Sequence, residues 1–484
     1  MKGTRAKGVV AAGHRLTAEA AAGVLREGGH AADAAIAALA MACVCEPVLA
    51  SPGGGGFAML RDGATGRATL VDFFPHTPRK RKLADDAGVA EVIADFGTAT
   101  QAFHIGPATA AAPGFLAGCE RLAALGGGRP LADLFAPAVR AARDGVRVTP
   151  YQHYLSTVVL PILTATPEAA ALFAPGGEMI GAGGTFRNPG LANALEAMAS
   201  GGLATSAVGN EVVGLQAGRG HLTADDLSSY EAIERRPLSV GIGAMTAHLN
   251  PLPAASGVLI ADSLNGIGDV GGVTLARALD ATDRARRQAG HDLSRLIDRP
   301  LRQRGTTHVS VIDAAGNACA VTVSNGEGNG EPVGRFGFML NNILGEEDVN
   351  PAGASAWPEN VRLASMMCPA ILEAPDGAIV ALGSGGSNRI RSAIAQVIAH
   401  LALDGANLAD AVVAPRLHVE NGHLDFEDFF DAGARAALAA AFGDHRAWPE
   451  RNMFFGGVHA ASVDADGRFS GIGDARRDGA ALLV

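Results

Sequence analysis

The chain has 484 residues, of which 48% are hydrophobic and only 18% are charged, so it can bury a large core and extensive disorder is excluded. Its formal net charge of −10 and isoelectric point near 5.8 argue against nucleic acid as a partner, because phosphate binding draws on clustered lysine and arginine. The expected partner is a small-molecule or short-peptide amide substrate.

The N-terminus is charged but lacks a following apolar stretch of signal-peptide length, and residues 31–44 are too short and interrupted to span a bilayer. We therefore expect a cytoplasmic protein that does not bind a membrane. The cysteines form no Cys-x-x-Cys pair, which argues against a disulfide framework and a zinc ribbon. Buried, reduced thiols are expected at Cys43, Cys45, Cys119, Cys319 and Cys368.

The first 60 residues predict two short strands, two helices and a glycine-rich loop. In chain order these are a strand at 8–12, a helix at 17–27, an alanine-rich helix at 31–43, a loop at 51–56 and a strand at 57–60. Pro47 breaks the helical pattern after the second helix.

The middle third, residues 116–276, is mostly helical in pattern, as in 131–144 and 191–198. From 277 to 304 charged residues crowd together and the apolar periodicity fades. We expect a solvated, mobile segment there.

A rigid hairpin is predicted directly after this charged segment. Residues 306–312 alternate as a half-buried strand does, 313–317 supply a turn, and 318–323 return as a second strand. Gly305 and Thr306 therefore mark a boundary at which backbone cleavage costs little structure.

Cleavage before Thr306 would create a catalyst with an N-terminal threonine. A threonine hydroxyl needs a neighbouring base, and a free α-amine, whose pKa is roughly 7.7–8.0 in peptides, can supply one. Gly305 lacks a Cβ, so it can adopt the strained geometry that lets the Thr306 hydroxyl attack the preceding carbonyl.

Two later segments could complete this site. Residues 324–330 begin with a hydroxyl and an amide and contain three glycines, and residues 383–389 follow an apolar strand at 378–382 with N–H groups suited to a developing oxyanion. Glycines 53–56 lack the Gly-Lys-Ser/Thr of a phosphate loop, no His-Glu-x-x-His motif occurs, and Ser384 is not in a Gly-x-Ser-x-Gly elbow. No metal or other cofactor is expected.

Motifs along nearly the whole chain, from about Gly8 to Gly479, resemble the gamma-glutamyltranspeptidase family of N-terminal-nucleophile (Ntn) hydrolases. They include Thr306-Thr307-His308, Leu340-Asn341-Asn342, Gly53 to Phe57, Ala112-Pro113-Gly114 and the Gly-Ser-Gly-Gly stretch before Arg389. The resemblance implies an α+β fold, a four-layer αββα sandwich built jointly by residues 1–305 and 306–484. It also implies self-cleavage between Gly305 and Thr306, which leaves a heterodimer of the two fragments.

The same resemblance implies roles for individual residues. Thr306 is the nucleophile that carries the acyl group, and Ser324 is a second hydroxyl that assists it. Gly385 and Gly386 form the oxyanion hole, and Asn325 contacts the substrate.

The substrate pocket departs from the family pattern. Phe74 replaces the arginine that grips the α-carboxylate of a gamma-glutamyl group, so a bidentate clamp is lost. Of the serine pair that shares this carboxylate, Ser365 remains and Met366 replaces its partner. Glu346, or Glu347 with a one-residue slip, matches the acidic residue that holds the substrate amine.

Several alternatives stay open at this stage. Arg335 is either a relocated carboxylate anchor or a solvated surface arginine, and Trp357 either covers the pocket or packs in the core. The first hypothesis is a self-processing enzyme that transfers or hydrolyses a gamma-glutamyl group from glutathione-like amides. The second keeps the same machinery but has glutaryl or another short dicarboxylic monoamide as its acyl group, which Phe74 favours. A third interpretation is an unprocessed relative that acts as a binding protein.

Overall fold

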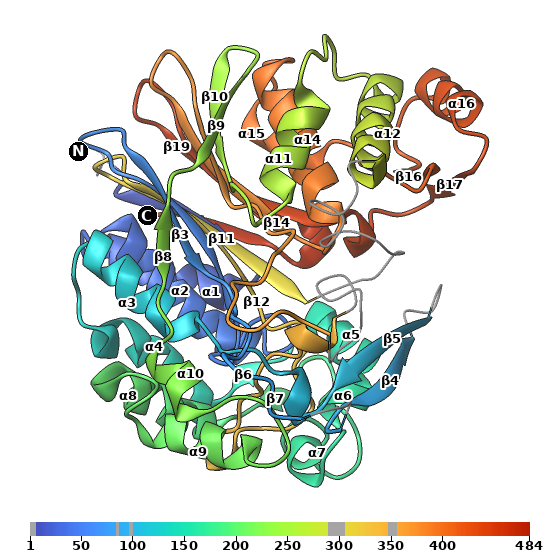
Figure 1. The fold of residues 1–484 in the computed structure, drawn as a ribbon. Helices are drawn as coiled ribbons and strands as arrows, with labels where there is room; N and C mark the ends of the chain where they lie inside the picture. The colour runs from blue at the N-terminus through green and yellow to red at the C-terminus, as the bar shows by residue number, and fades with distance from the viewer. Residues whose placement is uncertain (1–5, 84–86, 96–99, 289–304, 347–355) are drawn as a thin grey trace.

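The computed structural model describes residues 6–83, 87–95, 100–288, 305–346 and 356–484. Two sheets lie face to face in the middle of the molecule, and helices cover the outer face of each (Figure 1). The expected α+β fold, a four-layer αββα sandwich, is confirmed.

The first sheet is antiparallel and takes strands from both sides of the Gly305–Thr306 bond. In spatial order it contains β20 (Ala480–Leu483), β1 (Gly8–Ala12), β11 (Thr306–Asp313), β12 (Ala318–Ser324), β2 (Gly55–Arg61), β3 (Ala68–Phe73) and β8 (Ile233–Arg235). The two segments predicted from the sequence therefore share one sheet.

The second sheet is also antiparallel and packs against β11 and β12 through β14 and β18. In spatial order it contains β19 (Phe469–Ile472), β18 (Gly457–Val463), β14 (Ile379–Gly385), β13 (Ala370–Glu373), β10 (Met245–Leu249) and β9 (Leu238–Ile242).

Helices on the outer face of the first sheet are α1 (Arg15–Arg26), α2 (Ala31–Cys45), α3 (Phe115–Leu125), α4 (Leu131–Asp144) and α8 (Pro189–Gly201). The second sheet carries α11 (Ser256–Leu264), α12 (Gly272–Gln288), α14 (Arg389–Ala402) and α15 (Leu408–Val413). The remaining elements are α5 (Pro150–Val158), α6 (Leu160–Leu163), α7 (Pro167–Phe173), α9 (Ala207–Gln216), α10 (Ala224–Ser228), α16 (Ala432–Ala441), β4 (Ala90–Asp95), β5 (Thr100–Ile105), β6 (Val146–Arg147), β7 (Thr185–Phe186), β15 (Leu417–Glu420), β16 (His423–Glu427) and β17 (His445–Trp448).

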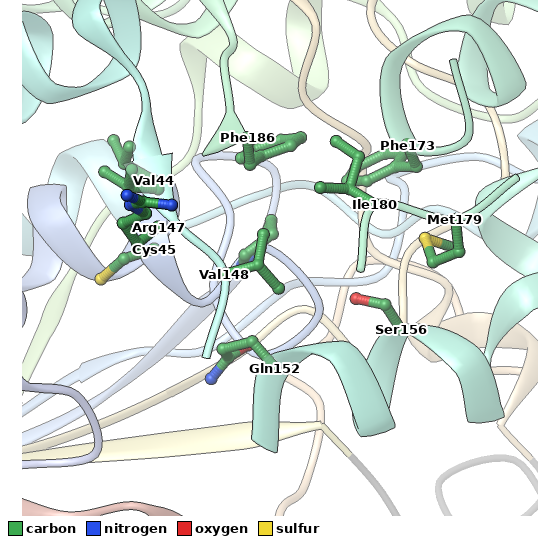
Figure 2. Close-up of a pocket in the computed structure, with 12 residues that line it drawn as sticks. Val44, Cys45, Arg147, Val148, Gln152, Ser156, Phe173, Met179, Ile180 and Phe186 are labelled. Atoms are coloured by element: carbon green, nitrogen blue, oxygen red, sulfur yellow. The ribbon is translucent and has the colours of Figure 1, made fainter. Parts of the chain in front are cut away.

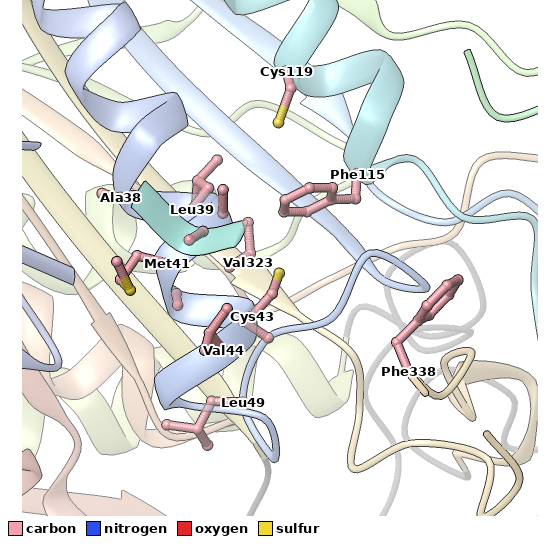
Figure 3. Close-up of a cluster of buried hydrophobic side chains, with 14 of the residues drawn as sticks. Ala38, Leu39, Met41, Cys43, Val44, Leu49, Phe115, Cys119, Val323 and Phe338 are labelled. Carbon is pink, nitrogen blue, oxygen red and sulfur yellow. The ribbon is translucent and has the colours of Figure 1, made fainter. Parts of the chain in front are cut away.

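Helix α2 lies at the centre of the larger core. Every one of its side chains is buried, because the first sheet covers one side and α1, α3 and α4 cover the others. A helix that is apolar all round suits such a position. Figure 3 shows its side chains meeting Phe115 and Cys119 of α3 and Val323 of β12. All five cysteines are buried and unpaired, as the sequence predicted.

The prediction of a solvated, mobile segment at 277–304 is wrong for its first part. Residues 277–288 belong to α12 rather than to a solvated stretch, and residues 289–304 lie outside the described part of the chain. Asp283 is fully buried, with Arg286 and Arg391 each 3.1 Å from its carboxylate. Sequence alone shows the charges but not the partner on α14 that neutralises them.

The middle third is also less helical than predicted. Strands β8, β9 and β10 lie within residues 233–249, and β9 with β10 forms one edge of the second sheet. Each of these strands has five residues or fewer, so the alternation that marks a strand is too brief to stand out in the sequence.

A row of buried polar side chains lies between the two sheets. His308 Nε2 donates to Ser310 Oγ and His308 Nδ1 accepts from Thr322 Oγ1, each at 2.8 Å. The Ser310 hydroxyl donates its proton to the carbonyl oxygen of His459, so it can only accept from His308 Nε2. This fixes the tautomer of His308, with the proton on Nε2. Burial lowers the pKa of His308 far below its ordinary value and lowers the pKa of His459 to about 4. Both rings are therefore neutral near pH 7.

We expect the free energy of unfolding to fall as the pH drops from about 6.5 toward 4. The unfolded histidines take up protons in this range, whereas the buried rings do not. For His459, a shift from 6.5 to about 4 corresponds to on the order of 3 kcal/mol. Urea unfolding across this range should show a flatter pH dependence for His459→Gln than for the wild type. An equal slope in the two proteins would contradict this assignment.

Candidate active site

Thr306 begins β11, and the strand pairing sets it opposite Ser324, the last residue of β12. Along β11, Val309 and Val311 pack in the core around α2, so the alternate residues Thr306 and His308 face the second sheet. Thr306 is 4% exposed. The predicted nucleophile and its predicted helper therefore lie side by side at one end of the strand pair.

The end of β14 closes the other side of Thr306. A Cβ on Gly385 would overlap the Thr306 carbonyl oxygen, and Gly386 has a φ of 122°, which strongly favours glycine. The sequence predicted that this strand ends at residue 382, but β14 (Ile379–Gly385) continues through Gly385 and the turn begins at Gly386. Helix α14 starts directly afterwards at Arg389, so its positive N-terminal end faces the turn. The predicted oxyanion glycines thus lie beside the predicted nucleophile.

A hydrogen bond joins Gly305 and Ser324. The Ser324 hydroxyl donates to the Gly305 carbonyl oxygen at 2.6 Å and accepts the Gly326 N–H at 3.0 Å. The carbonyl that Thr306 would attack in self-cleavage is therefore already polarised by a hydroxyl.

Phe74 follows β3 at the same end of the first sheet. It is 3% exposed and stacks on Phe57, with ring centroids 5.6 Å apart. The arginine that the structure brings to Phe74 is Arg362, which donates to the Phe74 carbonyl oxygen and lies 3.8 Å from Asp72. Sequence reasoning missed Arg362, because nothing links residues 74 and 362 before the chain is folded.

Three predicted substrate-binding residues border the strand ends or the second sheet. Asn325 is 1% exposed, and its Oδ1 accepts no hydrogen bond within the described residues. Glu346 Oε1 lies 2.7 Å from the place that a Cβ on Gly326 would take, so it adjoins the loop after β12. Ser365 Oγ accepts the Met367 N–H at 3.1 Å, next to the start of α11. Glu347 lies outside the described residues.

The structure does not bring Arg335 to this group. Its side chain is exposed over the ring of Phe336, and its backbone packs near Gly190 of α8. Trp357 is buried in the core, where His221 meets its edge at 5.0 Å between ring centroids.

Arg477 is a neighbour of the site that sequence reasoning missed. Its Nη1 lies 3.1 Å from the place of a Cβ on Gly385, and its Nη2 lies 3.1 Å from the place of one on Gly386. Arg477 is 4% exposed, and its Nε and Nη1 have no hydrogen-bond acceptor among the residues that the structure describes. A buried positive charge therefore lies beside the predicted oxyanion hole.

A separate apolar pocket lies beside the C-terminal end of α2, between α5, α7 and β6 (Figure 2). Its cavity of about 30 Å³ has room for about two water molecules. Gln152 lines it, and neither polar atom of its amide has a partner in the described part of the chain. The pocket is too small for an acyl chain, so we do not count it as part of the substrate site.

The sequence matches the pattern of the family described as Gamma-glutamyltranspeptidase over residues 17–289 and 274–484. The chain belongs to the gamma-glutamyltranspeptidase family. Members of this family are Ntn hydrolases or transferases, and this chain is an enzyme of that type.

Relatives within the gamma-glutamyltranspeptidase family carry two kinds of name. The "Acylase ACY 1 proenzyme" of Pseudomonas sp. (strain V22) is 29% identical over 99% of this chain and 94% of its own. The "Glutathione hydrolase proenzyme" of Escherichia coli (strain K12) is 27% identical over 86% of this chain and 81% of its own. The crystal structure of cephalosporin acylase from Bacillus halodurans has the same fold, with a TM-score of 0.82, 21% identity, and coverage of 99% of this chain and 96% of that one.

The described residues give no indication of a membrane span or a metal centre. Among them, no helix is both long and apolar enough to cross a bilayer. Nor do three or more His, Cys, Asp or Glu side chains gather there in a way that could hold a metal ion.

We expect Gly385→Ala to reduce kcat by about 100-fold or more. Its Cβ would push on the Thr306 carbonyl and disturb the donors for the oxyanion, whose individual loss costs about 10²–10³ in other enzymes. Hydrolysis of a chromogenic acyl anilide would measure this loss. Gly23→Ala on α1, where a Cβ would meet nothing within 4 Å, is the matched control and should retain full activity.

Proposed function

We propose that this enzyme cuts its own chain between Gly305 and Thr306 and then uses Thr306 to hydrolyse or transfer the acyl group of a small amide. The observation that carries this proposal is the meeting of Thr306, Ser324 and Gly385 at one point between the two sheets. Relatives whose names include the word proenzyme support a processed form. The two fragments would stay together as a heterodimer, since β1 and β2 of one flank β11 and β12 of the other.

In the processed enzyme the Thr306 hydroxyl attacks the carbonyl carbon of the substrate amide, and its proton passes to the free α-amine of Thr306. The oxyanion that forms lies against Gly385 and Gly386, beside the charge of Arg477. The amide C–N bond then breaks, and the leaving amine takes the proton from the α-amine. Water or another amine releases the acyl group from the threonine ester.

Ser324 changes partner during this sequence. In the uncut chain its hydroxyl donates to the Gly305 carbonyl oxygen. Once Gly305 leaves, that hydroxyl is free to face Thr306 across the strand pair. The role of helper to the nucleophile is therefore consistent with the position of Ser324 before and after cleavage.

For the acyl group we favour glutaryl or another short dicarboxylic monoamide. Phe74 stands where the family places an arginine for the α-carboxylate, and its buried ring stacks on the buried ring of Phe57. Two relatives named acylase, 29% and 30% identical, each align with 99% of the chain. The second candidate is a gamma-glutamyl group, which is favoured by Glu346 and Ser365 and by the relatives named glutathione hydrolase.

The first test is the fate of the chain itself. Intact mass should show fragments that end at Gly305 and begin at Thr306, and Thr306→Ala should stay one polypeptide without activity because it lacks the attacking hydroxyl. Thr306→Ser keeps a hydroxyl and an α-amine, so it should still be cut and remain active. A wild-type chain that stays intact after prolonged incubation would refute the proposal.

The second test concerns the acyl group. Wild-type kcat/KM should be higher for a glutaryl anilide than for a gamma-glutamyl anilide. Phe74→Arg should shift the ratio toward gamma-glutamyl by roughly 10- to 100-fold, since hydrogen bonds to a charged group contribute about 1.5–3 kcal/mol. Phe74→Leu keeps the site apolar and should leave the preference unchanged. A wild-type preference for gamma-glutamyl would instead support the second candidate.

A further inference from the structure

Gly305, the residue before the proposed cut, forms hydrogen bonds through both its N–H and its carbonyl oxygen. The partners are at the end of β12 and in the short loop that follows it. The Gly305 N–H donates to Glu327 Oε1 at 3.0 Å, and the Gly305 carbonyl oxygen accepts from Ser324 Oγ at 2.6 Å. Both partners lie within four residues of each other. Gly305 is therefore fixed in rotation as well as in position.

Packing around Gly305 leaves little freedom for any other arrangement. A Cβ at this position would lie 2.6 Å from the Gly326 carbonyl oxygen and 2.6 Å from that of Val48. Val48 follows α2, so both segments of the chain enclose Gly305. A residue with a side chain at position 305 would therefore have to displace one of these two carbonyl groups.

Glu327 is itself held by the fold. It is 3% exposed, and its N–H donates to Asn342 Oδ1 at 3.0 Å. The same asparagine donates from Nδ2 to the His104 carbonyl oxygen at 3.2 Å. The carboxylate therefore reaches Gly305 from a loop that is anchored to the other segment of the chain.

Building on the proposed function, we propose that Glu327 is a positioning residue for self-cleavage, which acts by holding the Gly305 N–H so that its carbonyl carbon faces the Thr306 hydroxyl. In this step Thr306 Oγ bonds to the Gly305 carbon, the Gly305–Thr306 C–N bond breaks, and the hydroxyl proton ends on the Thr306 nitrogen. Water then hydrolyses the Gly305 ester to a carboxylate and restores the hydroxyl. Glu327 takes up no proton in this sequence.

This role belongs to maturation rather than to turnover. The bond between Glu327 and Gly305 exists in the uncut chain and is lost when Gly305 departs. The rate of cleavage should therefore depend on an acceptor oxygen at position 327 more strongly than the hydrolysis of a small amide does.

The test compares cleavage rates of newly made chains. Pulse-labelled protein from cell-free synthesis, followed by gel and intact mass, should show Glu327→Ala cleaving about 10- to 100-fold more slowly than wild type, because the buried Gly305 N–H would lose its acceptor. Glu327→Gln keeps an acceptor oxygen and should remain within a few-fold of wild type. Glu331→Ala, on a nearby glutamate that pairs with Arg219 on the surface, should cleave normally.

A second measurement separates positioning from a loss of folding. In the uncleavable Thr306→Ala background, hydrogen exchange should protect the Gly305 amide, and adding Glu327→Ala should remove that protection without lowering the midpoint of thermal unfolding by more than a few degrees. Adding Glu327→Gln should preserve the protection. Equal exchange in all three proteins would overturn the inference.

The outcomes also separate this inference from the proposed function. If the wild-type chain never cleaves, the proposed function fails and the inference fails with it. If the wild type and Glu327→Ala cleave equally fast, only the inference fails. It also fails if the turnover per cleaved molecule falls as much as the cleavage rate, because Glu327 would then act on the substrate reaction.

Discussion

The register between β11 and β12 is the constraint on which the site depends. Side chains alternate between the faces of a strand, so a slip of one residue would turn Thr306 toward α2 and Thr307 toward the second sheet. The turn between the strands opposes this slip. The Asp313 carboxylate accepts the Asn317 N–H at 3.0 Å and also reaches the Ala31 N–H at 3.0 Å, at the start of α2. The hairpin is thereby fixed to the helix behind it.

The same register turns the neighbouring Thr307 to the opposite face of β11, where its hydroxyl has a structural role. Thr307 Oγ1 and Thr17 Oγ1 each donate to the buried Glu46 carboxylate at 2.7 Å, which joins β11 to α1 and to the end of α2. Burial raises the pKa of Glu46, whereas the nearby His14 and the two hydroxyls act against this shift. The Thr307 hydroxyl is thus bound to Glu46 and stabilises the fold. The adjacent Thr306 faces the second sheet, where the absence of a Cβ on Gly385 makes space for the Thr306 carbonyl oxygen.

Local patterns predicted the parts of this arrangement that depend on local physics. Alternation and turn chemistry placed both strands of the hairpin, and glycine spacing pointed to the end of β14. Pairing between distant residues could not be read in this way. The burial of Asp283 depends on Arg391 of another helix, and the approach of Arg362 to Phe74 depends on two loops meeting. Charged residues look alike in a sequence whether water or a buried partner neutralises them.

Arg476 and Arg477 are adjacent in the sequence but differ in whether buried carboxylates neutralise their charge. Arg476 donates to both oxygens of Glu427, at 2.7 and 2.6 Å, and lies 3.3 Å from Asp474, so buried carboxylates balance its charge. Arg477 points instead to the glycines at the end of β14, where its described hydrogen bond is a long one of 3.4 Å to the Met453 carbonyl oxygen. Within the described part of the chain Arg477 has no carboxylate partner, and a cation in such a poorly solvated place makes the local potential positive, which favours negative charge. The N-terminal end of α14 adds to it with the same sign. If the proposed oxyanion hole lies here, the ground state of an amide carbonyl would gain little from this field and the oxyanion of a tetrahedral intermediate would gain more, so the field would lower the barrier of the chemical step rather than the cost of binding.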